Sequence, residues 1–260
     1  MNNKLTILVP THSIPSIPKT AVIKQTLQSI FSFKELIECR CIIGYGTHTK
    51  PTKLEIKYHT NLIELKKEFP VIEVLLCSYA QQRKNFLNII KRVETDYFLF
   101  IEHDWIFVER LNFNKLIDVM DKYKFINTVF LNKRNNRPLP YPPCGDFILK
   151  PEPRVVEIPL LKTSKWSNNP NITRTSVWKD WWYDEVYNAP LNKSNPRKQI
   201  EPILHYHYMR DMGITDLHNI NINKLDFETA HAKWGMYSYG KIGENKMIEH
   251  MDGSNYKKNI

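Results

Sequence analysis

The stretch Tyr97-Phe98-Leu99-Phe100-Ile101-Glu102-His103-Asp104-Trp105 decides the fold. Its first five residues are all apolar or aromatic, as expected of a strand whose two faces are both covered by helices in a parallel sheet. Two carboxylates, Glu102 and Asp104, follow two positions apart, and they therefore lie on the same side of an extended chain. Ligands of open α/β sheets bind beyond the carboxyl ends of the strands, so both acids are expected at a ligand site.

Strand and helix signals alternate through the residues that lead to this stretch. Short apolar runs that end at Pro or Gly predict strands, and apolar residues spaced three or four apart predict helices. The predicted strands cover residues 5–9, 40–45, 71–77 and 97–101, and the predicted helices cover residues 20–31 and 80–93. This β-α-β-(α)-β-α-β series favours an α/β fold with an open, mostly parallel sheet flanked by helices, of the nucleotide-binding type.

The pattern changes after Trp105. We expect one more helix over residues 116–123, one more strand over residues 127–131, and a helix over residues 202–209 with Pro202 in its first turn. The proline-rich residues 132–153 are expected to form a loop. No glycine and serine spacer and no repeat interrupts the sequence, so residues 1–260 are expected to form a single domain.

The composition limits the kinds of partner. The 260 residues, 42% hydrophobic and 25% charged, fit an ordinary globular protein. Lys and Arg outnumber Asp and Glu by 37 to 27, and the net charge of +10 favours anionic partners. The lysines are dispersed rather than clustered, so we expect no nucleic-acid partner. No apolar run approaches the roughly 20 residues of a membrane-spanning helix, so at most a peripheral membrane association is expected.

Neither a secretion signal nor a disulfide framework is indicated. The apolar run at residues 5–9 is too short for a signal peptide. Cys39, Cys41, Cys77 and Cys144 lack the spacing of a disulfide scaffold, so we expect reduced thiols. These features favour a cytoplasmic protein.

Two carboxylates beside a phosphate ligand suit a divalent cation. Mg²⁺ and Mn²⁺ take few protein oxygens and share oxygens of the bound phosphates. Glu102 and Asp104 are therefore candidate ligands of Mn²⁺ or Mg²⁺. The alternative is a solvated acidic turn without a ligand.

The surrounding segments carry a family resemblance. Ala80-Gln81-Gln82-Arg83-Lys84-Asn85-Phe86, followed by Thr95-Asp96-Tyr97 and the stretch that ends at Asp104, resembles the centre of glycosyltransferase family 2 and its bacterial and viral relatives with the GT-A fold. In that family, a helix with an Arg-x-Asn element leads into a hydrophobic strand that ends in an Asp-x-Asp metal motif. The resemblance covers residues 4–108. It implies a nucleotide-sugar-binding half over residues 1–108 and an acceptor-binding half over residues 109–260.

The resemblance also implies residues that bind the donor. Pro10 and Thr11 look like the family's first nucleotide-contacting strand end, and His103 lies inside the metal motif. Arg83 is expected either to support the donor electrostatically or to form a surface ion pair. The second strand ends in Gly44-Tyr45-Gly46-Thr47, which offers Tyr45 to the donor but lacks the base-contacting aspartate of relatives.

The metal motif departs from the family pattern at one position. Glu102 stands where relatives usually have their first aspartate, which leaves Asp104 as the expected direct ligand. A late histidine completes the metal or diphosphate site in several GT-A enzymes, and His250, in His250-Met251-Asp252-Gly253, takes that place by resemblance. A structural role is the alternative for such a lone histidine. His205 and His207 are expected to point apart on a helix and not to bind metal.

Downstream motifs point to the acceptor side. Asn169, in Trp166-Ser167-Asn168-Asn169-Pro170, and Arg174 look like the acceptor-side loop of some members of the family. Trp178, Trp181 and Trp182 suit the apolar faces of sugars. The alternative is that these tryptophans share one helix face and form ordinary core.

The transfer needs a base that takes the proton of the acceptor hydroxyl. Glu201 is the first candidate, because the family's catalytic acid commonly begins a helix, as Glu201 does before Pro202. A plain helix-capping role is the alternative. Asp180 and Asp184 are reserve candidates.

The expected function is a metal-dependent, inverting glycosyltransferase that moves a hexosyl or pentosyl group from a nucleotide-diphosphate sugar to a glycan or lipid-linked acceptor. A sugar-nucleotide nucleotidyltransferase would use a similar sheet and cation, but it should have a glycine-rich loop after the first strand, and residues 10–18 contain no glycine. A non-enzymatic carbohydrate-binding protein built on the tryptophans is the other alternative.

Overall fold

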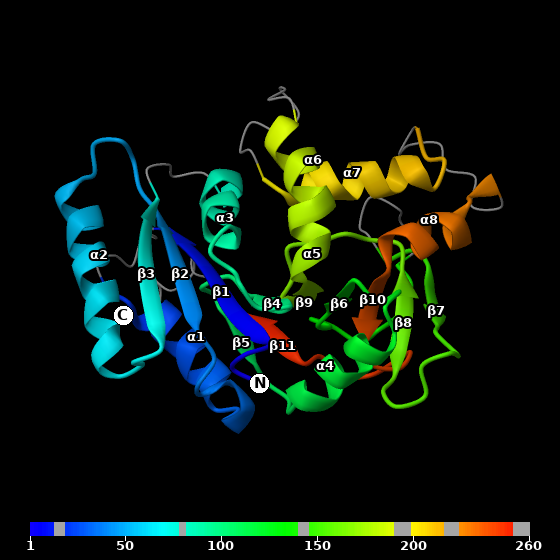
Figure 1. Ribbon diagram of the computed structural model, residues 1–260, viewed down its shortest axis with the longest axis horizontal. Coiled ribbons are helices and arrows are strands. Elements are labelled where there is room, and N and C mark those ends of the chain that lie inside the picture. Colours follow the sequence, from blue (N-terminus) through cyan, green and yellow to red (C-terminus); the bar gives the residue numbers. More distant parts are fainter. Residues whose placement is uncertain (13–18, 78–81, 140–145, 190–198, 216–223, 252–260) are drawn as a thin grey trace.

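The computed structural model describes residues 1–12, 19–77, 82–139, 146–189, 199–215 and 224–251 (Figure 1). The strands are β1 (Leu5–His12), β2 (Cys41–Gly46), β3 (Ile72–Cys77), β4 (Tyr97–Phe100), β5 (Trp105–Phe107), β6 (Thr128–Phe130), β7 (Leu149–Pro151), β8 (Leu160–Thr163), β9 (Asn171–Arg174), β10 (Met236–Tyr239) and β11 (Ile248–His250). The helices are α1 (Ala21–Phe31), α2 (Lys53–Glu64), α3 (Gln82–Ile90), α4 (Phe113–Lys122), α5 (Thr175–Val177), α6 (Tyr183–Asn188), α7 (Glu201–Asp211) and α8 (Phe227–Trp234). A π-helical turn, Trp178–Trp182, joins α5 to α6.

A long twisted sheet runs through the molecule in the order β3-β2-β1-β4-β9-β6-β10-β8-β7. Strands β3, β2, β1 and β4 are parallel neighbours. Strands β9 and β8 pair antiparallel with their neighbours, whereas β6 and β10 are parallel to each other. A separate small sheet pairs β11 with β5. The expected α/β fold with an open, mostly parallel sheet is therefore confirmed.

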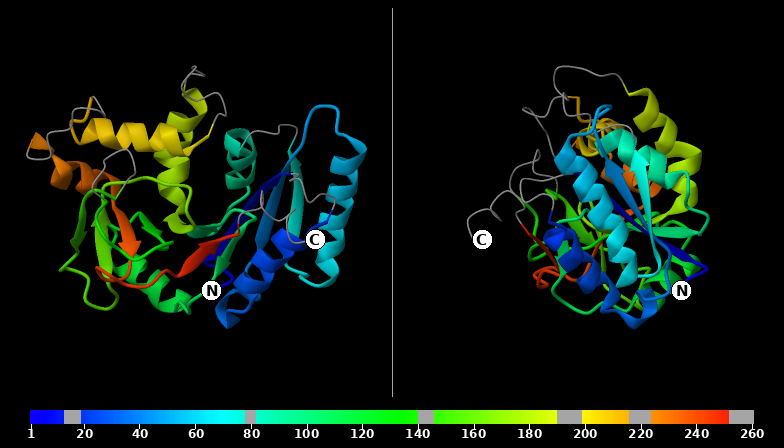
Figure 2. Two further views of the ribbon diagram at one scale, coloured as in Figure 1. Left: turned by 180° about the vertical axis from the view of Figure 1, so that it is seen from behind. Right: turned by 90° about the vertical axis from the view of Figure 1, so that its left-hand side faces the viewer.

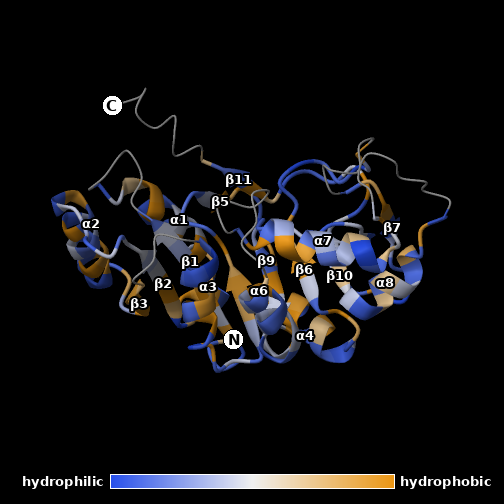
Figure 3. Ribbon diagram, turned by 90° about the horizontal axis from the view of Figure 1, so that it is seen from above, coloured by the Kyte–Doolittle hydropathy of each residue, from blue (hydrophilic) through white to orange (hydrophobic). Residues whose placement is uncertain are grey.

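Two apolar cores lie on the two faces of this sheet. One core joins alternate residues of β1, such as Leu5 and Ile7, to the apolar sides of α1, α2 and α4. The other joins Leu8 of the same strand to α3, α6, α7 and α8. The views from behind and from the side show these helix layers (Figure 2), and the hydropathy colouring shows apolar strands between them (Figure 3).

Local signals set the ends of several helices. Thr52 and Glu55 form a reciprocal capping box at the start of α2, and Asp226 accepts from the N–H of Thr229 at the start of α8. Gly235 ends α8 in the left-handed region, at φ 60°. Since β10 begins at the next residue, this glycine turns the chain directly into the sheet.

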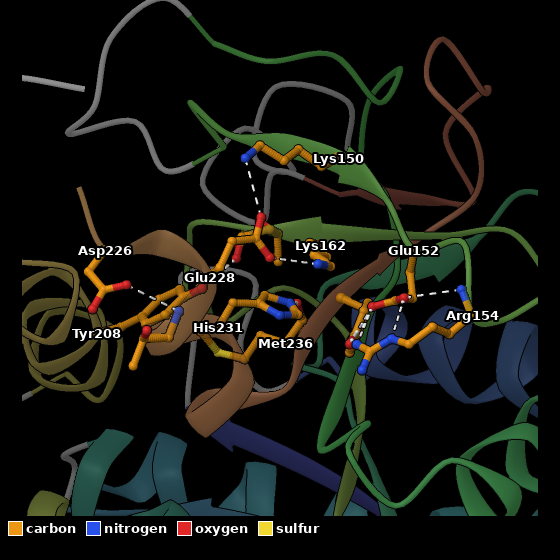
Figure 4. Close-up of polar contacts among 12 residues, drawn as sticks. Lys150, Glu152, Arg154, Lys162, Tyr208, Asp226, Glu228, His231 and Met236 are labelled. Carbon is orange, nitrogen blue, oxygen red and sulfur yellow. Dashed lines mark hydrogen bonds and ion pairs between the residues drawn. The ribbon is translucent and has the colours of Figure 1, made fainter. Parts of the chain in front are cut away.

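Polar contacts fix the far end of the sheet (Figure 4). Glu228 of α8 pairs with Lys150 and Lys162, which lie on β7 and β8. The carboxyl group of Glu152 is fully buried and binds the guanidinium of Arg154 through both oxygens, at 2.7 Å each. These contacts tie helix and strands of the second half together.

The first strand differs from its predicted form, because it continues past Pro10 to His12. The N–H of Ile7 donates to Arg40 O on the β2 side, and Leu8 O accepts from the N–H of Ile101 on the β4 side. The backbone N–H and C=O groups of even-numbered residues in β1 therefore point towards β4. Pro10 lies beyond the last pair with β4, Leu8 with Phe100, so its missing N–H leaves no gap in the ladder. Strands β1 and β4 separate at this point.

The second half is less like its prediction. Residues 132–153, expected to be a loop, contain β7, and the predictions omit β5, β8, β9, β10, β11 and α8. The predicted helix over residues 202–209 is confirmed as α7. Cys39, Cys41 and Cys77 are buried free thiols, and Cys144 lies outside the described residues. Within the described ranges, no helix is both long enough and apolar enough to cross a membrane.

Candidate functional site

A pocket of about 360 Å³ opens where β1 and β4 separate, at the carboxyl ends of the parallel strands. Eight residues proposed from the sequence line it: Pro10, Thr11, Glu102, His103, Asp104, Asn169, Glu201 and His250. This is the position in which open α/β sheets bind ligands. The structure therefore brings these eight side chains together in one pocket.

Asp104 and His250, which are 146 positions apart in the sequence, meet in this pocket. Strand β11 runs antiparallel to β5 and places His250 opposite Trp105 (Figure 1). The N–H of Met251 donates to Asp104 O at 2.7 Å. His250 Nε2 then lies 3.1 Å from Asp104 Oδ2, and its ring packs on the Trp105 ring with centroids 4.8 Å apart.

The acidic side chains fit a divalent cation. Asp104 Oδ1 is buried without a hydrogen-bond partner among the described residues, so a carboxylate oxygen is left for a ligand. Glu102 accepts a hydrogen bond from Gln82 and lies in the same pocket. Across the described residues, no cluster of three or more His, Cys, Asp and Glu side chains is close enough to hold a metal alone. Asp104 and His250 would therefore share a cation with ligand oxygens, as Mg²⁺ and Mn²⁺ commonly require.

Negative charge is concentrated on this side of the pocket. Burial, followed by the charges of Asp104 and Glu201, raises the pKa of Glu102 to about 8, while the hydrogen bond from Gln82 opposes the rise. The charged forms of Glu102 and Asp104 repel each other, and a cation beside these two side chains would remove this repulsion.

His103 stands beside the acids as a neutral imidazole. Burial lowers its pKa to about 4, although the charge of Asp104 opposes this. Its ring donates to the backbone carbonyl of Pro10 and meets the His12 ring edge to face, with centroids 5.0 Å apart. Because Nε2 is buried with no partner among the described residues, His103 presents a free acceptor to the pocket.

Asn85 fixes the strand ends that form the pocket floor. Its Nδ2 donates to Gly44 O at 2.7 Å and to Thr11 O at 3.3 Å, and so it joins α3 to β2 and β1. Gly44 is required for this approach, since a Cβ there would lie 2.4 Å from Asn85 Oδ1. Thr11 Oγ1 lies 3.0 Å from the hydroxyl of Tyr58.

Glu201 begins α7 and lines the same pocket as Glu102 and Asp104. Neighbouring protein atoms displace water from its carboxyl group and so raise the pKa of Glu201, and the charge of Lys133 is the largest influence that lowers it. Glu201 also accepts hydrogen bonds from the backbone of Asn168 and the side chain of Ser167. Asp180 and Asp184, the reserve candidates for the base, are exposed on the helical segment of α5 and α6 and do not line the pocket.

Two residues expected at the donor lie elsewhere. Tyr45 points into the core beneath α2, where its hydroxyl donates to Glu55 O at 3.2 Å, and its neighbour Gly46 lines the pocket instead. Arg83 is buried, and its Nη1 donates to Ala189 O at 3.0 Å, which ties α3 to the end of α6. The Arg-x-Asn motif suggested that both side chains act at the site, but residues two positions apart in a helix lie on different sides of α3.

The aromatic concentration belongs to the core rather than to the pocket. Trp178 and Trp182 are 2% and 0% exposed and pack against each other with centroids 5.6 Å apart. Trp181 is partly buried against Trp234 at 4.7 Å. The packing alternative is therefore the one that the structure supports, and these rings leave no open face for an acceptor sugar at the pocket.

Arg174 is also structural. Its guanidinium donates to the Tyr97 hydroxyl at 2.8 Å and to the carbonyls of Met120 and Ile126. These contacts tie β9 to β4 and α4, and Arg174 does not line the pocket.

Several pocket residues escaped the sequence analysis: His12, Gly46, Gln82, Asn85, Trp105, Lys133, Asn168 and Gln199. Gln82 and Asn85 lie inside the quoted helix motif, three residues apart. Helical spacing places them on one face of the helix and could have identified them as a pair. Lys133 lies in a stretch expected to be a loop, and nothing in its local pattern places it beside Asp104.

Comparison with known proteins supports the fold. No protein-family model and no curated protein matches the chain. Among solved structures, TarS from S. aureus is 16% identical over 68% of this chain and 48% of its own, with a TM-score of 0.45. The mannosyltransferase PcManGT from Pyrobaculum calidifontis, in complex with GDP-Man and Mn²⁺, is 9% identical over 68% and 46%, with a TM-score of 0.44.

Another match is GalNAc-T7, solved with UDP, GalNAc and Mn²⁺. It is 7% identical over 95% of this chain and 43% of its own, with a TM-score of 0.51. The chain thus spans less than half the length of each of these solved proteins. At this identity the likeness concerns the fold, and it shows that the chain has a GT-A-like glycosyltransferase fold.

Proposed function

We propose that the protein is a glycosyltransferase that moves a sugar from a nucleotide-diphosphate sugar to a hydroxyl group of a glycan or lipid-linked acceptor. The meeting of Asp104 and His250 at the carboxyl ends of β1 and β4 carries this proposal. A solvated acidic turn would not need a buried, unpartnered carboxylate oxygen and a histidine brought from β11. GalNAc-T7, which has a similar fold, was solved with UDP, GalNAc and Mn²⁺.

Asp104 and His250 would hold Mn²⁺ or Mg²⁺, with Glu102 beside them. Such a cation neutralises the charge that develops on a departing nucleoside diphosphate without needing a proton. The residues of the chain position the donor around it. His103 Nε2, Asn85 Oδ1 and Asn168 Oδ1 are buried acceptors without partners among the described residues, and they suit the hydroxyl and N–H groups of a sugar nucleotide.

Glu201 is proposed as the base that accepts the proton of the acceptor hydroxyl. It lines the same pocket as Glu102 and Asp104. In the inverting transfer that we propose, Glu201 would take this proton on the face of the sugar opposite the leaving group. Lys133 and Lys165 act against the rise in the pKa of Glu201 and thereby favour the carboxylate form that a base needs.

The two alternative functions receive less support. A carbohydrate-binding protein would rely on Trp178 and Trp182, which are buried in the core. A nucleotidyltransferase would need a glycine-rich phosphate loop after β1, and residues 10–18 contain no glycine.

A thermal-shift panel tests the proposal, with UDP, GDP, dTDP and CMP each measured with and without Mn²⁺. A ligand at one hundred times its Kd stabilises the folded state by about 2.7 kcal/mol. For a chain of this size, that corresponds to a rise in Tm of roughly 5 to 10 °C. We expect such a rise for one or two of the nucleotides, and only when Mn²⁺ is present.

The matched variants are Asp104→Ala and Asp180→Ala, which each remove one aspartate. Asp104→Ala should abolish the Mn²⁺-dependent rise, whereas Asp180→Ala should keep it because Asp180 is exposed away from the pocket. Nucleotide shifts that need no metal, or that survive in Asp104→Ala, would contradict the proposed role of Asp104.

A further inference from the structure

Lys133 is a pocket residue to which the proposed transfer gives no direct contact. It follows β6 and lines the wall of the pocket near Trp105 and Glu201. We propose that the Lys133 ammonium binds the diphosphate of the donor beside the cation and stabilises it as the leaving group. This inference rests on the proposed function and assigns a second positive contact to the same phosphates.

The Trp105 ring connects Lys133 to the proposed cation ligands. Lys133 Nζ lies 5.7 Å from the centroid of this ring, within the range of a cation–π contact. The same ring packs on His250, whose Nε2 is 3.1 Å from Asp104 Oδ2. Lys133, Asp104 and His250 also line the same pocket, so a diphosphate held there through a cation would share that pocket with the lysine side chain.

The backbone around Lys133 is fixed to the segment that delivers His250. Asn132 Nδ2 donates to Asn245 O, and Asn132 O accepts from the N–H of Met247 at 2.8 Å. Strand β11 begins one residue later, at Ile248. The same backbone contacts therefore position both Lys133 and His250. A lysine on a loop without such contacts would not be held near His250.

In the part of the chain that the structure describes, no carboxylate forms an ion pair with the Lys133 ammonium. Among the described residues Lys133 forms no ion pair, and Lys165 and Arg134 place like charges nearby. Neighbouring protein atoms displace water from the ammonium and lower the pKa of Lys133, and the charges of Lys165 and Arg134 lower it further. The carboxylates of Glu201 and Asp146 act in the opposite direction but do not form ion pairs with Lys133. Phosphate oxygens would supply the missing partner, since lysine is a common phosphate ligand.

A different role for Lys133 would be to act only on Glu201. Its charge is the largest influence that lowers the pKa of that carboxyl group. In that case Lys133 would affect proton transfer but not the equilibrium binding of a nucleoside diphosphate. Binding measurements without an acceptor therefore separate the two roles.

The experiment is a calorimetric titration of the full chain with UDP and GDP in the presence of Mn²⁺, and with inorganic pyrophosphate in the presence of Mg²⁺. Pyrophosphate removes any dependence on the identity of the base. Lys133→Gln removes the charge, Lys133→Arg keeps it, and Arg134→Gln removes a neighbouring charge that does not line the pocket. Asp104→Ala reports on the cation site.

Lys133→Gln should weaken the binding of the diphosphates about tenfold, which is the low end for a hydrogen bond to a charged group. Lys133→Arg should keep most of the affinity, and Arg134→Gln should weaken binding less than threefold, roughly the effect of a screened exposed charge. The Tm without ligand should stay the same in these exposed variants.

Each outcome bears on one of the two proposals. If Asp104→Ala loses binding but Lys133→Gln binds like the wild type, the inference about Lys133 is wrong and the proposed function stands. If Arg134→Gln weakens binding as much as Lys133→Gln, the affinity comes from the general electrostatic attraction of positive charges near the pocket, and the direct contact with Lys133 is refuted. If the wild type binds neither the nucleotides nor pyrophosphate, both proposals are overturned.

Discussion

Replacing Gly44 by Ala should displace the helix that supports the pocket. A Cβ at position 44 would lie 2.4 Å from Asn85 Oδ1 and 2.6 Å from Ile89 Cγ2, whereas ordinary contacts are 3.4–4 Å. Both neighbours belong to α3, and neither can turn away because both are buried. Helix α3 must therefore move away from β2.

The size of the effect follows from these contacts. Overpacking of a well-packed core costs about 1 to 3 kcal/mol. The movement also weakens the hydrogen bonds from Asn85 Nδ2 to Gly44 O and Thr11 O, each worth about 1 kcal/mol. The free energy of unfolding should fall by about 2 to 4 kcal/mol. That fall corresponds to a decrease in Tm of roughly 5 to 15 °C.

Thermal unfolding and UDP or GDP binding with Mn²⁺ measure the two consequences. Gly213→Ala is the control, since Gly213 has a φ of +85° and no atom within 4 Å of the added Cβ. It should lose only about 1 kcal/mol of stability, from the backbone strain of an alanine at this φ, and keep its nucleotide affinity. Gly44→Ala should also lose affinity, because Gln82 and Asn85 of α3 line the pocket. A Tm decrease no larger than that of Gly213→Ala, with unchanged binding, would refute the close approach of α3.

Two further perturbations test the packing of the second half. Hydrogen bonding to Arg154 lowers the pKa of the buried Glu152 to about 2, so its contribution to stability is complete above pH 4.5 and is lost as the pH falls towards 2 (Figure 4). In urea unfolding, the wild type should lose about 2 kcal/mol more than Glu152→Gln between pH 7 and pH 3, and parallel pH profiles would contradict this. Trp182→Ala should cost about 3 to 5 kcal/mol, as expected for an aromatic core residue. Trp181→Ala, at a partly exposed position, should cost clearly less by the same measurement, and equal losses would argue against the core assignment.

The first half of the fold was predictable because its signals are local. The apolar run 97–101 must be a doubly covered strand, and the acids that follow must emerge at its carboxyl end. Pro10 predicts the end of the first strand, but the strand continues to His12. A proline is tolerated there because the pairing with β4 has already ended at Leu8. Local sequence does not report on where that pairing ends.

The other side of the pocket depends on contacts between distant residues. Asp104 and His250 are 146 positions apart, and only the pairing of β11 with β5 brings them together. The sequence pattern also left two readings of the tryptophans, because a helix face that packs in the core and one that binds a sugar have the same spacing. The π-helical turn at Trp178–Trp182, whose outer two tryptophans are buried, decided between them.

The most direct test of the account is pulsed electron paramagnetic resonance of Mn²⁺ bound together with UDP or GDP. We predict a nitrogen coupling from one coordinated imidazole that disappears in His250→Gln, and loss of the bound Mn²⁺ in Asp104→Ala. A nitrogen coupling that persists in His250→Gln, or an Asp104→Ala variant that binds Mn²⁺ and nucleotide like the wild type, would contradict the assignment of these two residues as cation ligands.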